Sequence, residues 1–142
     1  QMEKEIAKLH QQGFNCAQIV LSSFSEQLGI DSQLAKKVAA CFGGGMSWGE
    51  VCGCVTGALM AIGLKYGNYL PNSPEAKRQC AEKCAEFKEA FLEEYDSVIC
   101  RELLGYDISK PEEKKIIIEK GLLTDFCPEV MAYAIEVLQD IL

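Results

Sequence analysis

EVCGCVTGALMAIGLKYG, residues 50–67, places Cys52 and Cys54 on either side of a glycine at the head of an apolar run. The uncharged part, residues 51–64, is shorter than the roughly 20 residues that span a bilayer and is typical of a buried core helix. Gly53 and Gly57 lie one helical turn apart, so they share a face on which another backbone can pack closely. The stretch therefore predicts a central helix in tight contact with a neighbour.

Caps, glycines and prolines divide the rest of the chain into further helices, and no segment shows the alternation of a strand. Ser47 and Glu50 fit a Ser-x-x-Glu capping box, which predicts that the central helix starts there. The other helices are expected near residues 3–12, 15–29, 31–41, 74–95, 97–105, 109–121 and from about 127 onward. We expect one all-α domain over residues 1–142, a compact bundle of about six to eight helices around the glycine-rich one.

The amino-acid composition narrows the classes of partner that the protein is expected to bind. The 142 residues carry 14 Lys plus Arg and 21 Asp plus Glu, a net charge of -7, which disfavours nucleic acid and anionic membrane surfaces. The charged, amphipathic start does not predict a signal peptide. We therefore expect a cytoplasmic protein with no membrane insertion, and the 49% hydrophobic composition leaves a homodimer open.

The eight cysteines are the main chemical signal. They make up about 6% of the chain, below the level that marks a disulfide scaffold, and thiols in the cytoplasm are usually reduced. Such cysteines serve metal or redox chemistry or fill a core. Four of them lie near predicted helix starts: Cys16, Cys52, Cys100 and Cys127. A helix dipole alone lowers a thiol pKa by less than about one unit, so reactivity would also require that these thiols cluster.

The other four cysteines give weaker signals. Cys80 and Cys84 lie one turn apart on an apolar stripe and are better read as core contacts, although they could chelate an ion. Cys41 is also expected to fill the core. Cys54 would point about 200° away from Cys52 on a regular helix, so these two could not close on one ion.

Few other groups suggest chemistry. His10 is the sole histidine and is expected to face solvent, and Trp48 to close a pocket or pack a loop. The sequence contains no Cys-x-x-Cys, no Gly-Lys-Ser/Thr phosphate loop and no His-Glu-x-x-His. A hydrolase would have little acid or base to use.

Four segments together resemble the redox-active protein family named for its C-GCAxxG-C-C cysteine pattern. They are NCAQ at 15–18, FGGGMSWGEVCGCVTGALMAIGLKYG at 42–67, CRELLG at 100–105 and CPEV at 127–130. The four cysteines of that pattern fall on Cys16, Cys52, Cys100 and Cys127. Cys54 departs from the family motif, which has alanine there. The resemblance implies a small, mostly helical bacterial or archaeal protein, often encoded near transporter genes. It leaves the redox partner unknown, with a transporter-associated protein as one candidate.

Two functions from different classes stay open. The first is a thiol redox protein, such as a thiol–disulfide oxidoreductase, in which the four cysteines serve disulfide exchange or electron transfer. The second is a non-enzymatic module in which the same four thiolates hold an iron–sulfur cluster or zinc. A helical protein whose cysteines only pack ranks third. Both chemical hypotheses predict that Cys16, Cys52, Cys100 and Cys127 converge at the head of the glycine helix, and the first predicts a redox couple that involves Cys52.

Overall fold

The computed structural model describes residues 2–142 and confirms the all-α prediction. Within these residues there are nine α-helices and two short π-type turns, and no strand. Their bounds are α1 (Met2–Gln11), α2 (Cys16–Ser22), α3 (Ser25–Leu28), α4 (Ser32–Ala39), η1 (Gly45–Gly49), α5 (Gly53–Tyr66), α6 (Pro74–Glu94), α7 (Cys100–Leu104), α8 (Pro111–Glu119), η2 (Leu122–Phe126) and α9 (Cys127–Ile141). The helix expected over 15–29 is divided into α2 and α3.

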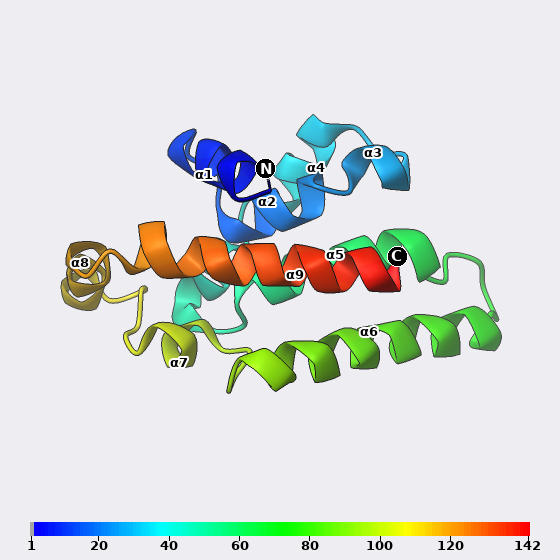
Figure 1. The fold of residues 1–142 in the computed structure, drawn as a ribbon. Coiled ribbons are helices and arrows are strands. Elements are labelled where there is room, and N and C mark those ends of the chain that lie inside the picture. The colour runs from blue at the N-terminus through cyan, green and yellow to red at the C-terminus, as the bar shows by residue number, and fades with distance from the viewer. Residues whose placement is uncertain (1) are drawn as a thin grey trace.

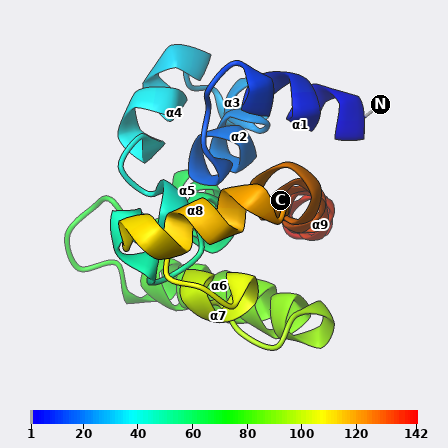
Figure 2. The ribbon, with the colours of Figure 1, turned by 90° about the vertical axis from the view of Figure 1, so that its left-hand side faces the viewer.

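The helices form three layers. α1 to α4 make one outer layer, α5 and α9 lie in the middle, and α6 runs along the other side, with α7 and α8 at one end (Figures 1 and 2). α5 packs against α2, α6 and α9, so the glycine-rich helix is central, as predicted. No helix in the described part of the chain has both the length and the apolar character needed to cross a membrane.

Glycines allow α2 to approach α5 closely. A Cβ added at Gly57 would lie 2.8 Å from the carbonyl oxygen of Ala17, and one at Gly53 would lie 3.0 Å from the Ala17 nitrogen. The first distance is too short for a side chain and the second is tighter than most Cβ contacts, and Ala17 itself is fully buried. The shared glycine face is therefore the surface on which the α2 backbone packs.

The start of α5 differs from the sequence prediction. The helix begins at Gly53 with Cys52 as its N-cap, not at Ser47. Met46 and Ser47 have φ of 62° and 61°, in a left-handed turn that continues from Gly44. A capping residue needs an extended backbone, so the Ser47 capping box is wrong.

Candidate functional site

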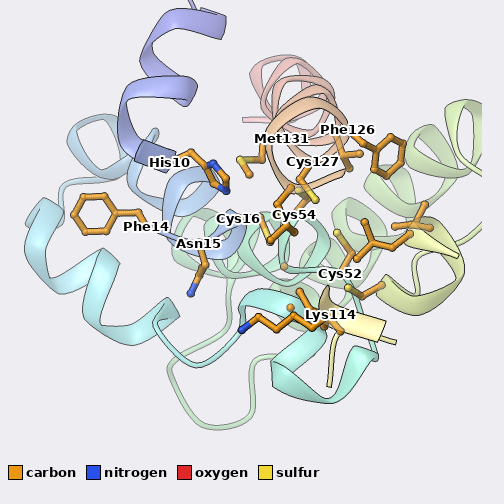
Figure 3. Close-up of a pocket in the computed structure, with 18 of the residues that line it drawn as sticks. His10, Phe14, Asn15, Cys16, Cys52, Cys54, Lys114, Phe126, Cys127 and Met131 are labelled. Atoms are coloured by element: carbon orange, nitrogen blue, oxygen red, sulfur yellow. The ribbon is translucent and has the colours of Figure 1, made fainter. Parts of the chain in front are cut away.

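Five cysteines line one cavity of about 400 Å³. They are Cys16, Cys52, Cys54, Cys100 and Cys127. The structure thus brings together all four cysteines singled out from the sequence and adds Cys54. Figure 3 shows four of these side chains gathered around the cavity from α2, the head of α5 and the start of α9. Their part in any chemistry stays a prediction.

Cys16 is positioned by the cap of α2. Asn15 accepts a hydrogen bond from the Gln18 backbone nitrogen, and the Gln18 side chain accepts one from the Asn15 nitrogen, which completes a capping box. Cys16 is the first residue of the helix, as predicted. Its sulfur lies directly over Gly53, where an added Cβ would be 2.5 Å away. The missing side chain of Gly53 therefore makes the space that the Cys16 sulfur occupies.

Backbone pairing holds Cys52 next to Cys100. Val51 and Ile99 form an isolated antiparallel bridge. The Cys52 nitrogen donates to the Val98 carbonyl at 2.7 Å, and the Cys100 nitrogen donates to the Glu50 carbonyl at 2.5 Å. Two segments almost fifty residues apart in sequence are thus fixed side by side at the cavity.

Cys54 belongs to the site, contrary to the expectation from a regular helix. Cys52 has φ of -55° and ψ of 138°, so it lies before the first helical turn. The angle of about 200° between the two side chains therefore does not apply. Instead, the thiols of Cys52 and Cys54 both form hydrogen bonds with Cys16.

These hydrogen bonds favour ionisation of Cys16 over that of its neighbours. Donation from Cys52, and then from Cys54, holds the pKa of Cys16 well below its usual range, with further help from the backbone N–H groups of Gly44 and Ala17. The same bonds to Cys16, together with burial, raise the pKa of Cys52 and of Cys54. The arrangement favours the thiolate form at Cys16 and the protonated form at the two thiols beside it.

Cys100 and Cys127 are neutral thiols at neutral pH. Burial is the largest cause that raises the pKa of each to about 12, and the negative charge of Cys16 adds to it. The charge of Cys16 raises the pKa of both thiols, so the ionisation of Cys16 is coupled to that of the other four cavity cysteines. Among the five cavity cysteines, Cys16 is the one whose pKa is lowered.

The rest of the cavity wall is mostly apolar. Its side chains include Leu103, Leu104, Ile108, Leu123, Val130 and Met131. Two basic side chains join them, Lys114 and His10. The expectation that His10 faces solvent is wrong, because its half-buried ring lines the cavity at the end of α1 (Figure 3).

Two further expectations need correction, and one is supported. Trp48 does not line the cysteine cavity and is 69% exposed on the left-handed turn, so it neither closes that cavity nor packs tightly over a loop. Cys41 is exposed and does not fill the core. Cys80 and Cys84 are half-buried on α6 and pack against the main core, in line with their expected role.

The cysteines singled out from the sequence are also candidate metal ligands. Across residues 2–142 no group of three or more His, Cys, Asp or Glu side chains has an arrangement that could hold a metal ion.

Comparison with known proteins gives one match. A family model described as "Putative redox-active protein (C_GCAxxG_C_C)" matches residues 14–141. No curated protein and no solved structure matches the chain. The matched segment contains all five cavity cysteines, and it covers nearly the whole fold.

Proposed function

Since this chain belongs to the C_GCAxxG_C_C family of redox-active proteins, we propose that its redox chemistry is thiol–disulfide exchange begun by the Cys16 thiolate. The observation that carries the proposal is the pair of thiols that hydrogen-bond to Cys16. A thiolate is the reactive form of cysteine in disulfide exchange. Here it lies within reach of two thiols, either of which could resolve a mixed disulfide.

Cys52 is the better resolving thiol. Cys54 lies in the regular part of α5 and is 1% exposed, whereas Cys52 is 9% exposed and precedes the helix. The extended backbone at Cys52 lets its sulfur adjust without unwinding a helical turn. Cys54 then keeps its hydrogen bond to Cys16 and serves as a positioning residue.

The exchange proceeds in two displacements. The Cys16 thiolate attacks one sulfur of a substrate disulfide, whose S–S bond breaks, so that a mixed disulfide forms and one substrate thiolate leaves. That thiolate takes the proton of Cys52. The Cys52 thiolate then attacks the Cys16 sulfur, the Cys16–Cys52 disulfide forms, and the second substrate thiolate leaves. The substrate gains two electrons and the protein loses two, which a dithiol reductant returns.

Cys100 and Cys127 complete the proposed set of four. Both are protonated and close enough to Cys16 to sense its charge. When Cys16 is oxidised that charge disappears, and their ionisation becomes easier. We therefore assign them a later step, transfer of the disulfide from the first pair.

A redox titration tests the proposal. The protein is equilibrated in buffers of defined dithiothreitol or glutathione ratio, quenched with an alkylating agent and analysed by peptide mass. We expect one reversible two-electron couple that joins Cys16 to Cys52. Cys52→Ser should abolish it, and the matched control Cys84→Ser should leave it unchanged. A titration curve unaltered by Cys52→Ser would refute the assignment.

Anaerobic purification separates this function from its competitor. We expect colourless protein with substoichiometric zinc and iron and with free thiols at the cavity. Visible charge-transfer bands, or one equivalent of tightly held zinc lost in Cys16→Ser, would replace disulfide exchange with the metal-binding function.

A further inference from the structure

Within residues 2–142, the cavity wall lacks the acidic side chains that dominate the rest of the molecule. The chain carries a net charge of -7, yet none of the described residues that line the cavity is Asp or Glu. Apart from the cysteines, its ionisable side chains are His10 and Lys114. In the view of Figure 3 these two lie on different sides of the thiols.

Lys114 marks the mouth of the cavity. It is exposed to solvent and also lines the cavity, so it lies where the cavity opens to solvent. The adjacent carboxylate does not neutralise it: Glu113 accepts a hydrogen bond from the Asp107 nitrogen and pairs with Lys110. Among residues 2–142 no ion pair involves Lys114. Its ammonium group is available to an anion that enters.

The interior suits a small apolar group. About 400 Å³ is within the range of small-molecule sites, and most of the other side chains that line the cavity are aliphatic, aromatic or sulfur-containing. Cys52 and Cys54 are among them and are almost wholly buried. A disulfide on the surface of a folded protein could not reach both the thiolate and its resolving partner.

We propose that the substrate is a small organic disulfide with an apolar body and an acidic group, whose anion binds Lys114 while its sulfurs reach Cys16. This inference rests on the exchange function proposed above and adds the substrate class. The two displacements are the same, and the departing thiols carry the acidic groups. Lys114 contacts the substrate but no reacting sulfur, so it determines specificity.

Two aromatic disulfides of similar shape test the inference. Dithiobis(nitrobenzoate) is a dianion at neutral pH and dithiodipyridine is neutral, and each releases a coloured thiol or thione. The reduced protein is mixed with each in a stopped-flow instrument. For Lys114→Gln we expect the rate with the dianion to fall about tenfold and to become less dependent on salt, while the rate with the neutral disulfide is unchanged. Lys115→Gln, on the same helix but outside the cavity, is the matched control.

The outcomes separate this inference from the proposed function. Equal losses with both disulfides would mean that Lys114 acts on the Cys16 thiolate, which would overturn the substrate class and leave the exchange function intact. Equal losses in Lys115→Gln and Lys114→Gln with the dianion would also overturn it, because general surface charge would then be the cause. If neither disulfide oxidises Cys16 in the unmodified protein, the exchange function fails and the inference fails with it.

Discussion

Two regions of this protein contain closely spaced cysteines, and they differ in what surrounds them. Cys52 and Cys54 at the head of α5 meet Cys16, which arrives from α2. Cys80 and Cys84, one turn apart on α6, have only each other as neighbouring thiols. At the cavity one thiol pKa is lowered, whereas burial, followed by the effect of Cys80, raises the pKa of Cys84. Two cysteines that are close in sequence therefore do not lower a thiol pKa by themselves. The pKa is lowered where a third sulfur approaches from another helix.

Glycine makes the difference between the two regions. Gly53 leaves the space into which the Cys16 sulfur fits, and the glycine-rich turn before α5 directs the Gly44 N–H toward the same sulfur. α6 has no glycine between Pro74 and Glu94. A neighbouring backbone cannot come as close there, so its thiols remain ordinary side chains on the edge of the core.

The largest expected effect is a difference in alkylation between the two regions. Because the pKa of Cys16 is lowered, its thiolate persists as pH falls below the usual cysteine value of about 8.5, and its reaction with iodoacetamide should stay fast at neutral pH. The raised pKa of Cys84 shifts its reaction to higher pH. Peptide mass analysis after timed alkylation between pH 5 and 10 measures both profiles. Matching profiles would remove the distinction between the regions.

Denaturation provides the control for that experiment. In the unfolded chain the two thiols should react with the same pH dependence, since the hydrogen bonds to Cys16 are lost. If Cys16 keeps its reactivity at low pH in denaturant, local sequence and not the cavity would be its cause.

Much of the difference between the cavity cysteines and those on α6 could be predicted from the sequence. Helix starts and the order of motifs identified the four cysteines that the structure places in one cavity, and the glycine spacing identified the face of α5 that α2 packs against. Asn15 was recognisable as a cap because its hydrogen bonds are local. These features depend on residues a few positions apart, where spacing determines geometry.

The features that sequence did not predict depend on tertiary contacts. Cys54 joined the site because Cys52 adopts an extended backbone, stabilised by pairing with residues near Cys100. The pKa of Cys16 is lowered because its sulfur meets those of Cys52 and Cys54, which come from another segment of the chain. His10 lines the cavity because of how α1 packs, and its surrounding sequence contains no signal of that position.

A second experiment tests the glycine explanation within one helix. Gly53→Ala would place a Cβ 2.5 Å from the Cys16 sulfur, so either the sulfur or α2 must move. We expect a loss of about 1 to 3 kcal/mol in the free energy of unfolding, as for other overpacked sites, together with slower alkylation of Cys16. Urea denaturation measures the first and peptide mass analysis the second.

Gly63→Ala is the matched control on α5. Gly63 is exposed, and an added Cβ meets nothing within 4 Å. Replacement should raise the free energy of unfolding by up to about 1 kcal/mol, because alanine favours the helix, and should leave Cys16 reactivity unchanged. Destabilisation by both variants would mean that α5 rejects any side chain, and the close approach of Cys16 would not explain Gly53.

The smallest expected effect concerns the single hydrogen bond that Cys54 donates to the Cys16 thiolate. Hydrogen bonds to charged groups contribute about 1.5 to 3 kcal/mol, and Cys52 and the backbone donors partly replace a lost one. Cys54→Ala should therefore raise the pKa of Cys16 by about one unit, at 1.36 kcal/mol per unit, and shift its alkylation profile to higher pH. Cys54→Ser keeps an O–H donor of similar size and should restore most of that shift. An equal shift in both variants would show that Cys54 acts through packing, and Cys52 alone would then hold the thiolate.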